Sequence, residues 1–169
     1  MSEKKISRTH RLVLMAMLAA VQIVLSRFLS INLWNLKIGF AFVPIALAGM
    51  LLGPLGAGLT GIIADMIGAT LFPSGAFFPG FTLTAFITAF GYGFFLYQKQ
   101  DMPHILGAVL FSEIAGTILL NTKWLSILYG TPFLPTMIPR LGQAVGMAVV
   151  EIIVIQLLAK YMPQLKKAI

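Results

Sequence analysis

Residues 53–81 decide the fold, and they read GPLGAGLTGIIADMIGATLFPSGAFFPGF. The segment opens with a Gly-Pro turn, continues as an apolar helix, and ends in a turn rich in Pro, Gly and Phe before another apolar stretch. Small residues recur in the helix at i, i+4, i+7 and i+11: Ala57, Gly61, Ala64 and Gly68. They share one face, and small residues in a membrane helix let a neighbouring backbone approach closely. We therefore expect this helix to be central.

A carboxylate lies beside this face. Asp65 follows Pro54 by eleven residues, which places it near the middle of a bilayer. A charge at that depth costs roughly 2.5–3.5 kcal/mol on insertion scales, so the side chain should face protein or a wet cavity. A carboxylate hydrogen-bonded to neighbouring helices is favoured over one that contacts a ligand.

The composition indicates an integral membrane protein. Hydrophobic residues make up 59% of the 169 residues, charged residues make up 10%, and the mean hydropathy is +0.94. An ordinary soluble domain carries about 25% charged residues. Because a span needs about 20 apolar residues, the length allows five to seven helices and one membrane domain, residues 1–169. The chain has no cysteine, and we expect no metal site and no bound cofactor.

The apolar segments predict an all-α bundle of six transmembrane helices. A basic start followed by an apolar run resembles a secretory signal, but no small-residue cleavage site follows it, so we interpret it as an uncleaved first helix. The expected helices are Leu12–Phe28, Ile38–Leu52, 54–72, Phe81–Tyr97, His104–Leu128 and Pro135–Tyr161.

Basic residues predict the orientation of these helices. Eight of the twelve fall on one side if the N-terminus is cytoplasmic: Lys4, Lys5, Arg8, Arg11, Lys99, Lys160, Lys166 and Lys167. Cytoplasmic loops are enriched in Lys and Arg, so both termini are expected to be cytoplasmic. The net charge of +7 is then a matter of topology and does not indicate nucleic acid.

The other four cations lie toward the outer side: Arg27, Lys37, Lys123 and Arg140. The outer loops contain no acid to neutralise them. Each one alone is equally well explained as an interfacial side chain that extends to water. Together they favour an anionic ligand that enters from outside, because Arg binds a carboxylate as a fork and Lys acts as a point charge.

Aromatic and amide side chains gather in the same outer half. Trp and Tyr at an interface are usually anchoring residues, but rings such as Trp34, Phe78 and Trp124 also suit stacking on a planar heterocycle. Asn121 and Gln143 offer amides nearby. Rings, amides and cations together fit a flat, amide-like head with an acidic tail.

Enzyme chemistry is not indicated. The sequence has no phosphate-binding P-loop motif, and no Ser–His or Asp–Asp pair falls within the expected helices. Glu113 and Glu151 are expected at similar depth in the cytoplasmic half, where structural acids are favoured over a proton-coupling pair. The chain also shows no clear pair of internal repeats, so movement of a solute would depend on an energy source outside this chain.

Several motifs resemble one family. They are Ala16-x-x-x-Ala20, Ile38-Gly39-Phe40 leading to Pro44, Gly53-Pro54, Asp65-Met66-Ile67-Gly68, the 72–82 turn, Asn121-Thr122-Lys123-Trp124-Leu125 with Tyr129-Gly130, and Pro139-Arg140-Leu141. The chain is similar to the substrate-binding S components of energy-coupling factor (ECF) vitamin transporters. The turn and the two last motifs most resemble the folate-specific type. Lys123 departs from the apolar residue expected there.

The resemblance implies a multi-pass protein of the bacterial cell membrane that binds folate from outside. It would deliver the vitamin to an ECF T component and two cytoplasmic ATPase subunits of an ABC importer. Ala16 and Ala20 would contact the T component, although the residues alone favour internal packing, and the loop Ser30–Lys37 would cover the site.

The resemblance and the residues together suggest roles for eight side chains. Arg27, Lys37 and Arg140 are candidates for the glutamate carboxylates; Trp34, Phe78 and Trp124 for stacking; and Asn121 and Gln143 for hydrogen bonds to the pterin. Two alternatives stay open. The protein is an S component for another small vitamin (pantothenate, thiamine or a pyrimidine precursor), or a ligand-free accessory subunit.

Overall fold

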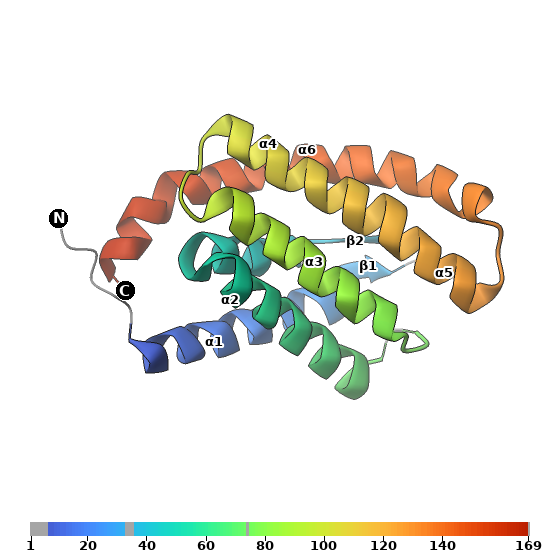
Figure 1. The fold of residues 1–169 in the computed structure, drawn as a ribbon, viewed down its shortest axis with the longest axis horizontal. Coiled ribbons are helices and arrows are strands. Elements are labelled where there is room, and N and C mark those ends of the chain that lie inside the picture. Colours follow the sequence, from blue (N-terminus) through green and yellow to red (C-terminus); the bar gives the residue numbers. More distant parts are fainter. Residues whose placement is uncertain (1–6, 33–35, 74, 169) are drawn as a thin grey trace.

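The computed structural model describes residues 7–32, 36–73 and 75–168, and it is mostly helical (Figure 1). Its elements are α1 (Arg8–Arg27), β1 (Ser30–Asn32), β2 (Lys37–Gly39), α2 (Phe42–Leu71), α3 (Pro79–Leu96), α4 (Met102–Phe111), the π-helix η1 (Ser112–Asn121), α5 (Thr122–Tyr129) and α6 (Phe133–Ala168). The beginning of α1 and the end of α6 lie at the same end of the molecule.

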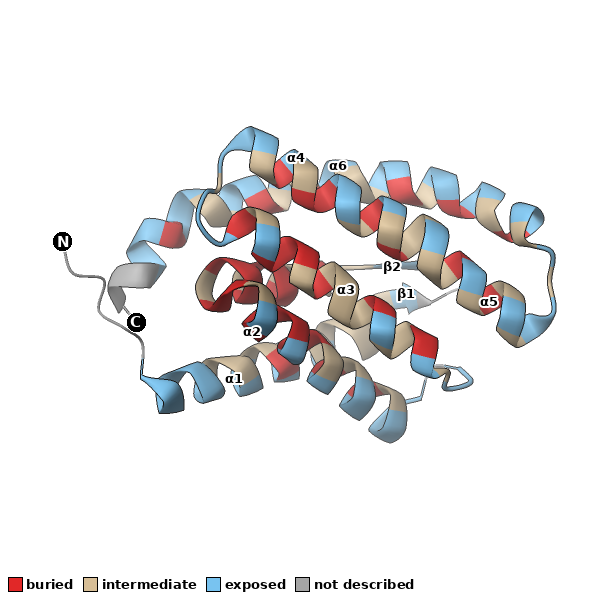
Figure 2. Ribbon diagram, viewed as in Figure 1, coloured by how far each residue is buried: buried red, intermediate tan, exposed pale blue. Residues whose placement is uncertain are grey.

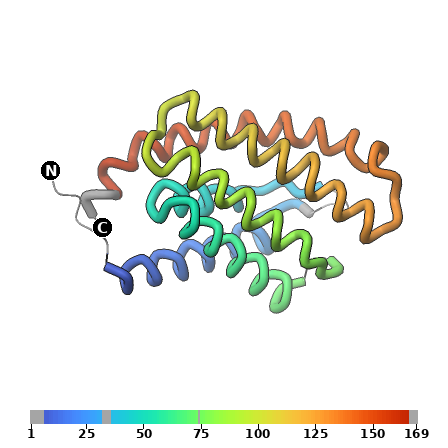
Figure 3. The backbone as a smooth tube through the Cα atoms, viewed as in Figure 1, coloured from blue at the N-terminus to red at the C-terminus, as the bar shows by residue number. Residues whose placement is uncertain are grey.

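The helices confirm a multi-pass membrane protein. Within the described residues, five helices are long and apolar enough to cross a bilayer: Arg8–Arg27, Phe42–Leu71, Pro79–Leu96, Met102–Tyr129 and Phe133–Leu165. The expected second and third helices are joined in α2. The expected fifth helix is α4, η1 and α5 in one continuous rod (Figure 3).

The Gly-Pro turn interrupts α2 where the sequence predicts it. Gly53 has φ 77° and ψ −174°, which is not a helical conformation. Glycine adopts this positive φ more readily than other residues, and Pro54 follows it. The turn divides α2 into segments 42–52 and 54–71. Arg11 of α1 donates from Nη2 to the Leu52 carbonyl oxygen at 2.9 Å, so a cation satisfies a backbone group beside the break.

The small-residue face of α2 is buried, as expected. Ala57, Gly61, Ala64 and Gly68 all lie in the interior, and the buried residues concentrate where α2 meets α3 (Figure 2). A Cβ at Gly61 would lie 2.7 Å from the carbonyl oxygen of Ala85 in α3. The backbones of the two helices therefore approach each other at a distance that larger residues would prevent.

The structure is mostly helical as expected, with one short exception. The predicted loop after the first helix contains an antiparallel hairpin, in which Ser30 pairs with Gly39 and Ile31 with Ile38. Gly39 permits this pairing, since a Cβ there would lie 2.7 Å from Cβ of Ser30. The helix expected from Ile38 consequently begins only at Phe42.

The packing of α2 on α3 generates a stability prediction. Replacement of Gly61 by Ala should lower the thermal unfolding midpoint of the detergent-solubilised protein, because overpacking costs typically about 1–3 kcal/mol. Gly142→Ala is the matched control, since nothing lies within 4 Å of a Cβ added at Gly142. Equal midpoints for the two variants, measured by circular dichroism, would contradict this packing.

Candidate ligand-binding cavity

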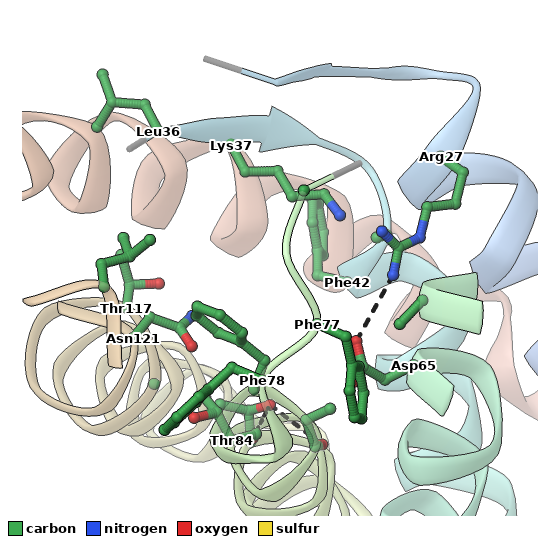
Figure 4. Close-up of a pocket in the computed structure, with 18 of the residues that line it drawn as sticks. Arg27, Leu36, Lys37, Phe42, Asp65, Phe77, Phe78, Thr84, Thr117 and Asn121 are labelled. Atoms are coloured by element: carbon green, nitrogen blue, oxygen red, sulfur yellow. Dashed lines mark hydrogen bonds and ion pairs between the residues drawn. The ribbon is translucent and has the colours of Figure 1, made fainter. Parts of the chain in front are cut away.

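A cavity of about 410 Å³ lies between the hairpin and the helices. Residues from α1, β2, α2, α3, η1, α5 and α6 line it, together with the turn before α3 (Figure 4). Its volume falls in the range of small-molecule sites, which run from about 300 to 1,000 Å³. Apolar rings and a small number of convergent polar groups share the lining.

Arg27 at the end of α1 forms an ion pair across the cavity wall. Its Nη2 lies 3.8 Å from Oδ1 of Asp65, whose Oδ2 accepts a hydrogen bond of 2.7 Å from Thr82 of α3. Gly68 makes room for the guanidinium, because a Cβ there would lie 2.8 Å from Arg27 Nε. The acid that pairs with Arg27 therefore comes from within α2 and not from an outer loop. Asp65 has hydrogen-bonded structural partners, and it also lines the cavity.

Lys37 of β2 reaches the same side of the cavity. Its side chain extends from the hairpin toward the region that Arg27 also approaches (Figure 4). Desolvation, and next the positive charge of Arg27, lower the pKa of Lys37 to about 8, while Asp65 acts in the opposite direction. The ammonium is thus charged at neutral pH but held in an environment that favours an added anion.

Phe78 provides an aromatic wall where α3 begins. Its ring centroid lies 5.6 Å from that of Trp124, which stands behind it and donates from Nε1 to Thr84 Oγ1 at 3.0 Å. Gly80 lets the indole approach, since a Cβ there would lie 2.5 Å from the Trp124 ring. The motif Phe-Pro-Gly therefore fixes Phe78 at the cavity, with Trp124 as its support.

The π-helix supplies a polar wall. Ser112, Gly116, Thr117 and Asn121 all line the cavity. Bonding from i to i+5 winds more residues into each turn than an α-helix does, so residues spaced in this way stay on one face. Arg140 of α6 is only 5% exposed, and its Nε donates to the Thr117 carbonyl oxygen at 3.1 Å.

Two acidic side chains, one of them on η1, are buried near the cavity. Glu113 and Glu151 are both buried, and Tyr92, which lines the cavity, donates to Oε2 of Glu151 at 2.7 Å. Among the described residues, no group of three or more His, Cys, Asp or Glu side chains is placed to hold a metal ion.

The structure brings most of the predicted site residues together. Five of them line the cavity: Arg27, Lys37, Phe78, Asn121 and Arg140. Trp124 supports the wall instead of lining it, and Gln143 donates from Nε2 to the Lys37 carbonyl oxygen at 2.5 Å. Trp34 lies outside the described residues. The fourth outer cation, Lys123, is exposed with its Nζ 5.7 Å from the Trp124 ring centroid.

Several lining residues were missed from the sequence. They are mostly apolar or hydroxyl side chains that membrane helices carry anywhere, among them Phe42, Phe81, Thr84, Thr88 and Tyr92. The spacing of these residues in the sequence does not distinguish a helix face that lines a cavity from one that packs against another helix. The sequence feature that could have indicated a cavity was the Asp65 carboxylate, because a charge near the middle of the bilayer should face protein or a wet cavity.

Comparison with known proteins establishes the class. The family model of the ECF transporter substrate-specific component matches residues 10–163, and the chain belongs to this family. The expected membership among S components is thereby confirmed.

Relatives within the family are folate transporters. The chain is 40% identical over 149 residues to the folate transporter FolT of Clostridium novyi (strain NT), which covers 88% of this chain and 87% of that protein. It is 41% identical over 125 residues to FolT of Leuconostoc mesenteroides, covering 73% of this chain and 67% of that one. A crystal structure of FolT bound with folic acid superposes with a TM-score of 0.83, at 37% identity, and covers 90% of this chain and 92% of that chain.

Proposed function

We propose that this protein binds folate at the outer side of the membrane, as the substrate-binding subunit of an ECF importer. The observation that carries the proposal is the cavity itself, which combines Arg27 and Lys37 on one side with the Phe78 ring and the polar wall of η1. The similarity to FolT bound with folic acid supports folate in particular.

The distribution of charge suggests how folate lies in the cavity. Its glutamate carboxylates would approach Arg27 and Lys37, where a fork of N–H donors and a point charge are available. The flat pterin would lie deeper, against Phe78 and within reach of Asn121 and Arg140. This orientation leaves the charged tail nearest to water, so the larger desolvation cost is avoided.

Six membrane crossings agree with the fold. Segment 42–52 has 11 residues and rises about 16 Å, roughly half of the hydrocarbon core of about 30 Å. Ile38, Gly39 and the turn to α2 would complete this second crossing, with Lys37 at its outer end, since non-helical backbone is tolerated at membrane depth where protein or a cavity covers it. Six crossings place both termini on one side, and the positive-inside rule makes that side cytoplasmic.

Uptake would need partners that hydrolyse ATP. We propose that a T component docks on the side of α1 that carries Ala16 and Ala20, and couples this subunit to two cytoplasmic ATPases. Both alanines are exposed, whereas Ala19 between them is buried at 3% exposure. The exposed positions favour docking over internal packing.

The ligand is tested by isothermal calorimetry on the solubilised protein expressed alone. Folate should bind with a Kd below about 1 µM, and pantothenate and thiamine should not bind detectably. Binding of one of the other vitamins instead would identify an S component of different specificity. No detectable binding of any of the three vitamins would support a ligand-free accessory subunit.

Titration of Lys37 predicts a pH dependence. Because its pKa in the empty site is about 8, the ammonium is present below that pH and is lost as pH rises through it. If folate binding requires the charged Lys37 ammonium, the affinity for folate should fall about tenfold from pH 7 to pH 9, because the fraction of protein with a charged Lys37 falls. Calorimetry at both pH values measures this change.

Two variants of Lys37 control for titration of folate itself, because a pH effect that comes from folate would be the same in the wild type and in both variants. Lys37→Met should bind weakly and lack the additional fall above pH 8. Lys37→Arg should bind well at both pH values because the guanidinium stays charged. A wild-type profile identical to that of Lys37→Met would exclude the Lys37 contact.

The docking surface is tested by Ala16→Trp. A large ring on the exposed side of α1 should abolish uptake of labelled folate by cells that contain the whole transporter, while the isolated subunit keeps its affinity. Val145→Trp is the control, since Val145 of α6 is 69% exposed. Loss of binding by Ala16→Trp would indicate internal packing, and normal uptake would place the docking surface elsewhere.

A further inference from the structure

Gln143 of α6 joins two parts of the chain that are distant in sequence. Its Nε2 donates to the carbonyl oxygen of Lys37 in β2 at 2.5 Å. Its Oε1 is buried and has no hydrogen-bond partner among the described residues. The polar contact of this side chain is therefore made with the backbone of the hairpin, and Gln143 is not among the cavity-lining residues.

The bond occupies a sheet edge. In a two-stranded hairpin each strand pairs on one side only, so backbone groups on the other side need another partner. β2 pairs with β1, and Gln143 supplies a donor from α6.

The residue held in this way also provides a cation to the cavity. Lys37 gives its carbonyl oxygen to Gln143 and its side chain to the cavity lining, and Leu36 beside it lines the cavity as well. A lysine side chain is long and flexible, so the position of its ammonium depends on how firmly the backbone of that residue is held. One turn earlier on α6, Arg140 lines the same cavity.

We propose that Gln143 is a positioning residue for ligand binding, which holds β2 against α6 so that the Lys37 ammonium stays at the cavity. It acts through Lys37 and touches no ligand. The inference rests on the proposed function for the identity of the anion, and not for the anchoring of β2.

The first experiment requires no ligand. Amide hydrogen exchange is measured in the solubilised protein for wild type and Gln143→Leu, which keeps similar volume but has no donor. Exchange at the Ile38 amide, which belongs to the same peptide unit as the Lys37 carbonyl, should accelerate about tenfold, as expected for loss of one hydrogen bond. Gln156→Leu is the control, since Gln156 is an exposed glutamine on the same helix. Unchanged exchange at β2 in Gln143→Leu would overturn the proposal.

The second experiment tests whether the effect passes through Lys37. Folate affinity is measured for wild type, Gln143→Leu, Lys37→Met and the double variant. Gln143→Leu should weaken binding about tenfold at pH 7 and lose the fall in affinity between pH 7 and 9. The double variant should be no weaker than Lys37→Met, because the two residues act as one unit.

Other outcomes are distinguishable. Additive losses in the double variant would mean that Gln143 acts on the ligand or through Arg140, and would overturn its role in positioning Lys37. If the wild-type protein binds no folate, the proposed function fails, and hydrogen exchange alone decides whether Gln143 anchors β2.

Discussion

The close approach of α2 and α3 is the constraint on which the rest of the structure depends. Lipid gives no hydrophobic drive between helices, so their association depends on packing. A Cβ at Gly49 would lie 2.8 Å from the Gly93 nitrogen, and one at Gly93 would lie 2.5 Å from Cα of Pro54. Because the backbones meet here, the outer half of α2 with Asp65 stands beside the beginning of α3 with Phe78. The cavity is the space that this pair shares with α1, the hairpin and the last helices.

Charge in the cavity is arranged so that the empty protein tolerates it. Asp65 lies 3.8 Å from Arg27 as an ion pair and is itself held by Thr82, while Arg140 bonds a backbone carbonyl of η1. A buried cation without such partners would be costly. Lys37 is an exposed residue, and its pKa is lowered by desolvation and by the nearby charge of Arg27. An arriving carboxylate would gain most beside this residue, which is why the hairpin that holds it matters to binding.

Features with a local or periodic signal could be predicted from the sequence. Composition indicated the membrane, the spacing of small residues gave the buried face of α2, and the Gly-Pro turn was placed at Gly53. The hairpin was not predicted, because each strand has only three residues, too few to show an alternating pattern, and the donor from α6 is 106 residues away in the sequence. The π register around Asn121 likewise has no signal in composition. The sequence assigned Trp124 and Phe78 to the same outer half, and the structure places their ring centroids 5.6 Å apart, with only Phe78 lining the cavity.

A structure of this protein with folate bound is the most direct test of the central claim, that cations beside the hairpin receive the acidic tail while rings and amides receive the head. We predict the glutamate carboxylates within hydrogen-bond distance of Arg27 and Lys37, with the pterin against Phe78 and close to Arg140. The reverse orientation, with the carboxylates on Arg140 and the pterin beside the hairpin, would contradict it.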